Sequence, residues 1–387
     1  MTDRCNKKVL FAISDSFPYG AAYAARTRAL CKLFQSVGYE TAVLCDYPSK
    51  GIETKEYGGI ITVSDKPYTG IAKLFFLPLN YQAELKKVLK KTKYDIVVSR
   101  SMFDRFDGVL RIVREFNIPI ILESCEWYDV KGFARGKHDI RYMQFQHCFK
   151  HSYNKVDGVI AISRLLEEHY LSKGIRTIRI PGIHEVSKLP YRIDRDKTSS
   201  VSFVFAGAIY GGKESFEDFI IALSKVDFSF SLNIYGPKKD EVEENLTDHG
   251  KECLHRVIKN VNFYGKIPQE EMPKVCSEND FGVFFRPDRR SSHAGFPTKL
   301  GEYLSGGTPV ITNDTGDITM VVTDGNNGYI VNRYGVEGIK EVLDLCSALS
   351  REEYEKMRRS ARQSAEDKLD YSVYKELLFS FLDSISR

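Results

Sequence analysis

The sequence predicts an α/β protein made of two Rossmann-like units, each a doubly wound parallel sheet, that face each other across a cleft. Short apolar segments alternate with amphipathic segments of helical period along most of the chain. A polar, proline-containing stretch at residues 187–200 interrupts this alternation, which then restarts. The length of 387 residues suits two or three domains of ordinary size.

Six apolar segments in the first half have the length and composition of buried strands. Amphipathic segments separate them, and parallel strands joined in this way need right-handed crossover connections. The expected strands are residues 9–13, 40–44, 60–63, 95–98, 118–122 and 158–162. The expected helices are residues 22–37, 81–91, 104–116 and 164–173.

The second half repeats this rhythm and ends in two helices. Its expected strands are residues 201–205, 228–235, 261–264, 281–285, 309–312 and 328–331. Its expected helices are residues 216–224, 240–257, 269–276, 298–305 and 335–349, then a charged helix at 351–368 and an amphipathic one at 371–385. We therefore expect a first domain at 1–186, a linker at 187–200, a second domain at 201–368 and a C-terminal helix at 369–387 that can cross back to the first domain.

Composition excludes several classes of protein. A hydrophobic content of 42% and a charged content of 28% are those of an ordinary globular chain, and a formal net charge of +4 is too weak to indicate nucleic-acid binding. No apolar run reaches the ~18–20 residues of a membrane span. The eight cysteines form no CxxC pair, and the first residues do not resemble a secretion signal. These features predict a cytoplasmic protein without disulfides or structural zinc.

One basic segment leaves two interpretations open. Residues 81–93 carry five lysines, with Leu85, Val88 and Leu89 at helical spacing, after an apolar run at 74–79. The first interpretation, which we prefer, is a solvated surface helix beside a core segment. The second is a basic and partly apolar face that rests on an anionic membrane.

Several loops that follow predicted strands of the second half have residues suited to a phosphate or a base. Gly207 follows one strand, and Lys213 comes shortly before the next helix, where its cation could meet a phosphate. Lys266 and Ile267 follow the strand at 261–264, and their backbone groups could meet the edge of a base. Flexible turns are the alternative for each of these loops.

The stretch from Phe284 to Val310 carries the strongest chemical signal. A loop with Arg286 leads to a helix start at Pro297-Thr298-Lys299, and Glu302 lies one turn into that helix. Cations and free backbone N–H groups at a helix start suit a diphosphate. Lys299 and Glu302 are three residues apart and share a helix face, so a carboxylate is available for a pair of sugar hydroxyls. The combination predicts a nucleotide-sugar site.

The run Glu302-Tyr-Leu-Ser-Gly-Gly-Thr-Pro-Val310 resembles the second half of a two-glutamate motif of the GT-B glycosyltransferases of family 4, also called group 1. The resemblance implies that Glu302 holds the ribose hydroxyls of a nucleotide. Ala294 stands where the family has its first glutamate, and Gly295 and Phe296 match the residues that follow it. Their backbone N–H groups, with that of Thr298, would serve the donor. Lys213 and Lys299, with Arg286, resemble the cations that bind the diphosphate.

This resemblance also implies an activity. A retaining hexosyltransferase would use a nucleoside-diphosphate sugar as donor, with Lys213 and Lys299 stabilising the leaving group and no metal or other cofactor. The acceptor would be a glycan or a lipid-linked sugar of bacterial surface-polysaccharide synthesis, at the inner face of the cell membrane. Gly20, in the loop after the first strand, would lie beside the donor phosphate. No nucleic-acid partner is expected.

The segment Glu123-Ser-Cys-Glu126-Trp127-Tyr128-Asp129 follows the strand at 118–122 and has two interpretations. It could form a sugar-facing platform in which Glu126 is a general base. Alternatively, it is an acidic loop with a packed tryptophan. Two helix residues, Arg26 and Arg28, follow the Gly20 loop, and we expect one of them to be solvated.

Two other functions remain compatible with the sequence. A sugar-nucleotide epimerase can have the same fold, because fold alone does not determine function. A protein that binds a sugar nucleotide without turning it over would explain Ala294 in place of a glutamate.

Overall fold

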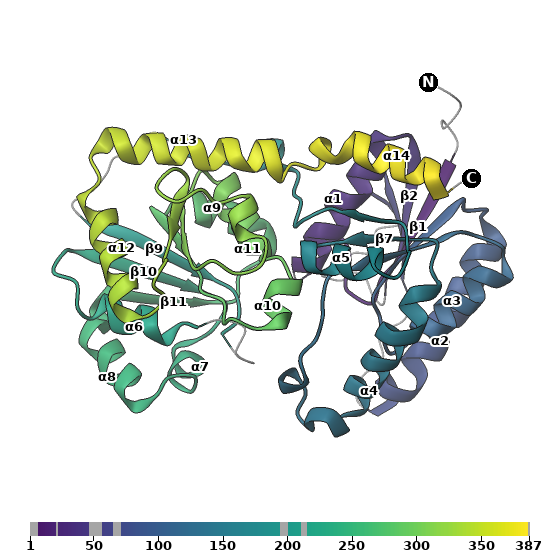
Figure 1. Ribbon diagram of the computed structural model, residues 1–387, viewed down its shortest axis with the longest axis horizontal. Helices are drawn as coiled ribbons and strands as arrows, with labels where there is room; N and C mark the ends of the chain where they lie inside the picture. Colours follow the sequence, from purple (N-terminus) through teal and green to yellow (C-terminus); the bar gives the residue numbers. More distant parts are fainter. Residues whose placement is uncertain are drawn as a thin grey trace. The chain divides into compact units, whose positions relative to one another are not determined.

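The computed structural model describes residues 7–20, 22–45, 56–64, 71–193, 200–209 and 215–385, with backbone only for 61–64, 71–78 and 270 (Figure 1). Contacts divide the chain into two compact units. Unit 1 comprises Met1–His184, Ala294–Phe296 and Tyr371–Arg387, and unit 2 comprises Glu185–His293 and Pro297–Asp370. The predicted fold class of two Rossmann-like parallel sheets flanked by helices is confirmed.

Unit 1 contains an eight-stranded sheet of order β3-β4-β2-β1-β5-β6-β7-β8. All neighbouring strands are parallel except β3 and β4, which pair antiparallel. The order reverses between β1 and β5, and such a switch point is where open α/β sheets bind ligands. The strands are β1 (Lys7–Ala12), β2 (Tyr39–Cys45), β3 (Glu56–Tyr57), β4 (Ile60–Ser64), β5 (Ile96–Arg100), β6 (Ile120–Ser124), β7 (Gly158–Ala161) and β8 (Thr177–Arg179).

Helices cover both faces of this sheet (Figure 1). α3 shows why the sequence forms them, since Phe106, Val109 and Val113 recur at helical spacing on its buried face. α4 begins at a cap in which the Asp139 side chain accepts from the Arg141 backbone N–H. The helices are α1 (Ala22–Ser36), α2 (Ile71–Lys91), α3 (Phe106–Glu115), α4 (Ile140–His147) and α5 (Arg164–Leu171).

The last helix of the chain, α14 (Lys375–Ile385), belongs to unit 1. Leu378, Phe381 and Leu382 are buried in the same core as β1 and α1. The approach is close because β7 begins with Gly158, where an added Cβ would lie 2.6 Å from the Phe381 ring. The terminal helix therefore completes the core of the first sheet.

Unit 2 contains a six-stranded parallel sheet of order β11-β10-β9-β12-β13-β14. Every residue of β9 is buried, as expected of a strand covered on both faces. The order reverses between β9 and β12, which defines the switch point of this sheet. The strands are β9 (Val201–Ala206), β10 (Phe230–Tyr235), β11 (Val261–Gly265), β12 (Phe281–Val283), β13 (Val310–Thr312) and β14 (Gly328–Ile330).

One predicted helix of unit 2 is two helices. Residues 240–257 were expected to be continuous, but Thr247 adopts an extended conformation and its side chain accepts from Gly250 N–H, so a new helix begins there. α13 begins with a capping box between Ser350 and Glu353. The helices are α6 (Glu217–Leu223), α7 (Lys239–Glu243), α8 (Asp248–Val257), α9 (Met272–Ser277), α10 (Arg290–Ala294), α11 (Thr298–Ser305), α12 (Val336–Ala348) and α13 (Arg351–Lys368).

Two buried arginines of α13 hold the segment at 185–193 against unit 2. Arg358 is fully buried and donates to the carbonyl oxygens of Arg192, Asn279 and Ser277 at 2.7–2.9 Å. Arg362 donates to the carbonyl oxygen of Ser305 at 2.7 Å. Part of the segment that was expected to be a linker is thus packed, while residues 194–199 lie outside the described residues.

Four elements were missing from the sequence interpretation: the short strands β3 and β8, and helices α4 and α10. α2 also begins at Ile71, ten residues before the expected start, and continues through Pro78. These elements are short or lack an apolar pattern, and neighbouring elements rather than local sequence stabilise them.

Candidate functional site

Two glycines at the carboxyl ends of β9 and β10 bring the unit 2 backbone together at the sheet edge. Gly207 and Gly236 have φ angles of 138° and 113°, in the region that favours glycine. Gly207 N–H donates to the carbonyl oxygen of Tyr235 at 3.0 Å, and a Cβ on Gly236 would collide with the carbonyl oxygen of Gly207. Gly207 is exposed, so the end of the central strand is accessible to solvent at this residue.

Lys299 lies over the switch point of this sheet. Its Nζ is 4.5 Å from the centroid of the Phe205 ring in β9 and 5.8 Å from that of Phe284, which directly follows β12. A Cβ added to Gly207 would come within 2.9 Å of this Nζ. The half-buried ammonium is therefore held by aromatic faces beside the exposed Gly207, at the first turn of α11.

Tyr303 fixes α11 at this position. Its hydroxyl accepts a hydrogen bond from Ala206 N–H at 2.9 Å, and Ala206 is the last residue of β9. The ring lies against Gly282 of β12, where a Cβ would collide with it. Because Tyr303 lies one turn after Lys299, this anchor sets the position of Lys299.

We expect Tyr303→Phe to lower the free energy of unfolding of unit 2 by about 1–3 kcal/mol, because the buried Ala206 N–H loses its partner. Urea unfolding followed by circular dichroism measures this loss. Tyr264→Phe is the control, since Tyr264 is 52% exposed and its hydroxyl is 3.5 Å from Asn233 Oδ1. Its effect should stay within about 0.5 kcal/mol. Equal stability of the two variants would contradict the anchoring role.

Glu302 lies on α11 toward α9. Burial, followed by the charge of Glu302, raises the pKa of the Cys276 thiol in α9 well above its ordinary value, which indicates that the two side chains are close. Thr298, the first residue of α11, is half-buried. Lys266 is exposed and Ile267 half-buried in the loop after β11. Glu302 thus lies toward α9, while Thr298 begins α11 and Lys266 and Ile267 follow β11.

A stacked aromatic pair, absent from the sequence interpretation, borders this loop. The rings of Tyr235 and Tyr264 lie 4.5 Å apart with an interplanar angle of 6°. They end the neighbouring strands β10 and β11. Tyr264 presents a flat apolar surface beside Lys266, of the kind on which another ring can stack.

The loop after β12 is tied to the loop after β13 through its backbone. Arg286 N–H donates to Asn313 Oδ1 at 2.8 Å, and Asn313 Nδ2 donates to the Arg286 carbonyl oxygen at 2.7 Å. His293 Nε2 lies 2.6 Å from Asp288 Oδ1, while its Nδ1 accepts from Gly316 N–H at 3.1 Å. His293, directly before position 294, is thus paired with Asp288.

Ala294, Gly295 and Phe296 are buried and pack with unit 1. The Ala294 carbonyl oxygen accepts from Ser163 Oγ at 2.6 Å. A Cβ added to Gly182 would lie 2.7 Å from the Phe296 ring. Position 294 therefore holds a packed methyl group.

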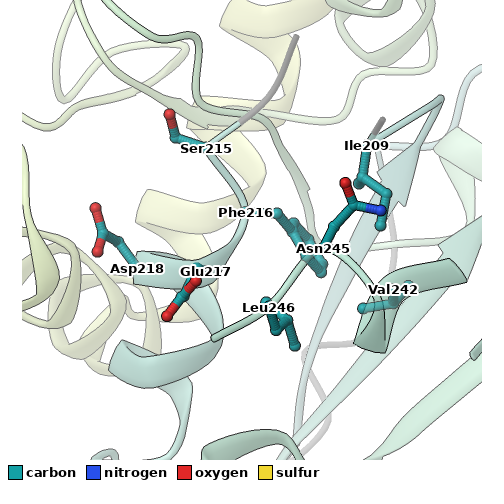
Figure 2. A pocket seen from close by; sticks show the side chains of 8 residues that line it. All are labelled: Ile209, Ser215, Phe216, Glu217, Asp218, Val242, Asn245 and Leu246. Carbon is teal, nitrogen blue, oxygen red and sulfur yellow. The ribbon is translucent and has the colours of Figure 1, made fainter. Parts of the chain in front are cut away.

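A cavity of about 330 Å³ lies between α6 and the end of α7 (Figure 2). Glu217 and Asp218 line it, and the Glu217 carboxylate accepts from Thr247 N–H and Oγ1. Two carboxylates make this cavity unsuited to a diphosphate. Lys213, predicted as a diphosphate cation, lies outside the described residues.

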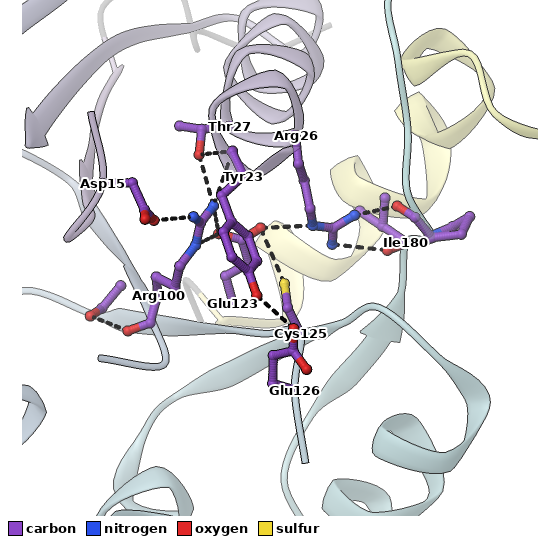
Figure 3. Close-up of polar contacts among 11 residues, drawn as sticks. Asp15, Tyr23, Arg26, Thr27, Arg100, Glu123, Cys125, Glu126 and Ile180 are labelled. Carbon is purple, nitrogen blue, oxygen red and sulfur yellow. Dashed lines mark hydrogen bonds and ion pairs between the residues drawn. The ribbon is translucent and has the colours of Figure 1, made fainter. Parts of the chain in front are cut away.

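The switch point of unit 1 carries a buried network of charges (Figure 3). Glu123, at the end of β6, accepts from Arg26 Nε at 2.8 Å and from Arg100 Nε and Nη2 at 3.2 Å. Arg100 also pairs with Asp15, after β1, at 2.6 Å. Arg26 also donates hydrogen bonds to the carbonyl oxygens of Ile180 and Pro181. Arg26 is 2% exposed, so of these two helix arginines only Arg28, half-buried over the Tyr19 ring, reaches solvent.

In this network, the attraction between the opposite charges outweighs the cost of removing them from water. Burial opposes the ionisation of Glu123, but Arg100 and Arg26 together hold the pKa of its carboxyl below the ordinary value. Burial likewise opposes the charge of Arg100. Several nearby groups nevertheless raise the pKa of Arg100, and Glu123 has the largest effect among them. Glu123 is therefore a structural anion rather than a base poised for proton transfer.

Glu126 is placed differently from Glu123. It is half-buried, and Tyr23 donates to its Oε1 at 2.6 Å. Burial, followed by the charge of Glu126, raises the pKa of Tyr23 well above its ordinary value, so this phenol remains a donor. Trp127 packs against Phe149 and His169, with ring centroids at 4.5 and 4.7 Å. The tryptophan is thus a packed residue, while Glu126 lies at the sheet edge.

Gly20, two neighbouring histidines and the cysteines are placed as follows. Gly20 is exposed in the loop after β1, where a Cβ would lie 3.2 Å from the Ser16 carbonyl oxygen. The rings of His147 and His151 are 5.4 Å apart. Among the described residues, no group of three or more His, Cys, Asp or Glu side chains could hold a metal. The described cysteines are free and buried.

Models of known protein families match both halves of the chain. Residues 24–184 match the model described as Glycosyltransferase Family 4, and residues 200–347 match the one described as Glycosyl transferases group 1. The chain belongs to the family 4 glycosyltransferases. It is a glycosyltransferase, as the resemblance to that family predicted.

Solved structures support the GT-B fold of this glycosyltransferase. HepE of Anabaena, in complex with UDP and glucose, is 14% identical with a TM-score of 0.70, and the match covers 98% of this chain and 100% of that chain. Sucrose-phosphate synthase from Thermosynechococcus elongatus is 14% identical with a TM-score of 0.75, over 98% and 99%. A Klebsiella pneumoniae protein, described as an uncharacterised 41.2 kDa protein in the cps region, is 25% identical over 274 residues, 67% of this chain and 71% of its own.

Sequence reasoning missed several residues that shape the two sheet edges of this glycosyltransferase. Arg100 ends a strand and Asn313 follows one, so a polar residue at a strand's carboxyl end was an available signal. Tyr303 carried no signal, because a tyrosine inside an amphipathic helix is indistinguishable from an ordinary core residue.

Proposed function

We propose that this glycosyltransferase moves a hexosyl group, with retention at the anomeric carbon, from a nucleoside-diphosphate sugar to a glycan or lipid-linked acceptor in bacterial surface-polysaccharide synthesis. The observation that carries the proposal is the position of Lys299. Its ammonium lies over the carboxyl ends of β9 and β12 at the start of α11, beside the exposed Gly207. Such a place suits a diphosphate that gains charge during the reaction.

In this proposal, the bond between the anomeric carbon and the β-phosphate oxygen breaks, and a bond to the acceptor oxygen forms. Lys299, the start of α11 and Arg286 stabilise the departing nucleoside diphosphate, together with Lys213. Glu302 accepts from the ribose hydroxyls, and Gly295, Phe296 and Thr298 offer backbone N–H groups. In a retaining transfer, the acceptor oxygen attacks the anomeric carbon on the same face from which the nucleoside diphosphate departs. The acceptor proton therefore passes to the departing phosphate oxygen or to Glu126. The proposal includes no metal or other cofactor.

Uridine diphosphate is the first nucleotide to test, because HepE was solved with it. The loop after β11, with Lys266 and Ile267, is the proposed contact for the base. The similarity to a protein of a cps region supports a surface polysaccharide as the product. Within the described part of the chain, no helix is long and apolar enough to cross a membrane. We propose a cytoplasmic protein that meets its acceptor at the inner membrane face.

A thermal-shift screen with UDP, GDP, dTDP, ADP and CMP tests the donor site. We expect one diphosphate to stabilise the protein by about 2–3 kcal/mol at a hundredfold excess over its dissociation constant. Glu302→Ala should remove most of this shift, because the ribose loses its carboxylate partner. Glu341→Ala, with a side chain that is 65% exposed on α12, is the matched control and should retain the shift. No shift with any of these nucleotides would overturn the nucleotide-sugar assignment.

A second candidate function rests on position 294, where a buried alanine replaces the first glutamate of the family motif. A protein that binds a sugar nucleotide without transferring the sugar would tolerate this loss. Release of the nucleoside diphosphate from a sugar nucleotide, measured with a cell-envelope acceptor extract, separates the two. Binding without release would favour the non-catalytic protein, and an isomerised sugar nucleotide would favour an epimerase.

A further inference from the structure

Residues 130–151 of unit 1 form a surface segment that the proposed sugar transfer does not use. It connects β6 to β7 and contains α4, which lies beside α2 at the edge of the unit (Figure 1). Its inner side is fixed by aromatic packing. The Phe145 ring lies 5.1 Å from that of Tyr128 and 5.3 Å from that of Phe149. The outer side is therefore a stable surface.

That outer side exposes large apolar side chains. Ile140 is 69% exposed and Met143 is 59% exposed, and the two are three residues apart on the same face of α4. Both line a cavity of about 530 Å³ between α2, α3 and α4, whose lining also includes Phe103 and Phe106 and the charged Asp104, Arg105 and Asp107. Exposed apolar side chains at such a cavity mark a place where another body binds.

The same segment carries a concentrated positive charge. It contains five lysines and arginines and one acidic residue, so its formal charge is 5 − 1 = +4, equal to that of all 387 residues together. The one acid, Asp139, is buried and pairs with Arg141 at 3.0 Å. In the cavity wall, Asp104 pairs with Arg105 and Asp107 lies 3.3 Å from His147. The cations are Lys131, Arg135, Lys137, Arg141 and Lys150.

We propose that residues 130–151 dock on an anionic lipid bilayer. Ile140 and Met143 enter the boundary of the acyl chains, and the surrounding lysines and arginines contact the anionic headgroups. Exposed apolar side chains on a segment of net positive charge fit such a bilayer better than an acidic protein surface, since acids paired with these cations would leave the apolar face uncovered. This inference rests on the proposed function at one point: docking on a bilayer would bring the enzyme to its proposed lipid-linked acceptor.

The helix first considered for membrane contact, at 81–93, is differently arranged. Tyr81, Leu85 and Leu89 are buried against the sheet, so its apolar face is already occupied. Lys86 and Lys87 pair with Glu115 and Glu84. Among the described side chains of these two helices, α4 exposes two large apolar residues, Ile140 and Met143, whereas α2 exposes one, Leu79.

Sedimentation of the full-length protein with vesicles tests the proposal. We expect binding to phosphatidylcholine vesicles that contain phosphatidylglycerol, and much weaker binding to phosphatidylcholine alone. Ile140→Glu with Met143→Glu should weaken binding at least ~10-fold, because two apolar contacts are lost and two anions added. Lys131→Ala with Lys137→Ala should weaken binding to the anionic vesicles by about 20–30-fold.

Matched controls come from unit 2. Leu345, 54% exposed on α12, is replaced by glutamate, and the exposed Arg256 and Lys259 are replaced by alanine. Equal loss of binding in these controls, or equal binding of the wild type to both kinds of vesicle, would overturn the proposal. The nucleotide thermal shift is measured on every variant. Vesicle binding without a nucleotide shift would overturn the proposed function and leave the docking surface standing.

Discussion

Replacement of Lys299 by methionine is expected to lower the rate of sugar transfer by about 10²–10³-fold, the loss seen when one preorganised group that stabilises a developing charge is removed. The ammonium already lies over the Phe205 and Phe284 rings, so it needs little reorganisation when the diphosphate departs. Methionine keeps the length and apolar contacts of the side chain but removes the charge. Initial rates at saturating donor measure the effect.

The fold of this variant should remain intact, because Tyr303 rather than Lys299 anchors α11 to β9. Lys274→Met, on the neighbouring α9 with a side chain 74% exposed, is the matched control and should retain the wild-type rate. Lys299→Arg should recover only part of the rate, since a planar guanidinium does not fit the place of a compact ammonium. A Lys299→Met enzyme with unchanged turnover would remove Lys299 from the mechanism.

The parts of this molecule that follow from local sequence were predicted from it. The apolar run at 201–205 became the central strand β9, buried along its whole length. The spacing of Lys299 and Glu302 predicted that both lie on one helix, and both belong to α11. These predictions succeeded because helical and strand periods are properties of short segments.

The parts that depend on contacts distant in sequence were not predicted. Arg26, Arg100 and Glu123 come from three separate elements, and only the folded sheet brings their charges together. The sequence did not show which of Arg26 and Arg28 is buried, because their helix gives no sign of the carboxylate that lies 97 positions after Arg26. The anchor between Tyr303 and β9 was hidden for the same reason.

Glu123→Gln is expected to have the largest effect on stability, a loss of about 3–5 kcal/mol from unit 1, because it removes the central anion of a buried ion network. Asp15, with a side chain that is 32% exposed, would remain as the acid that pairs with Arg100. Trp127 is the only tryptophan of the chain and packs within unit 1, so its fluorescence during urea unfolding reports on this unit. Glu126→Gln, at a half-buried position, is the control and should cost much less.

The pH dependence provides a second and independent test of the same network. Because Arg100 and Arg26 outweigh the burial of Glu123 and hold its pKa below the ordinary 4.5, the folded protein resists protonating this carboxyl more than the unfolded chain does. The contribution of Glu123 is therefore complete above the unfolded pKa and is lost as the pH falls through the lower, folded pKa. Wild-type stability should approach that of Glu123→Gln in this acid range, while the difference should be constant from about pH 6 to 8. Parallel curves down to the acid limit would show that Glu123 does not act through its charge, and the two arginines would then owe their burial to the carbonyl oxygens and to Asp15.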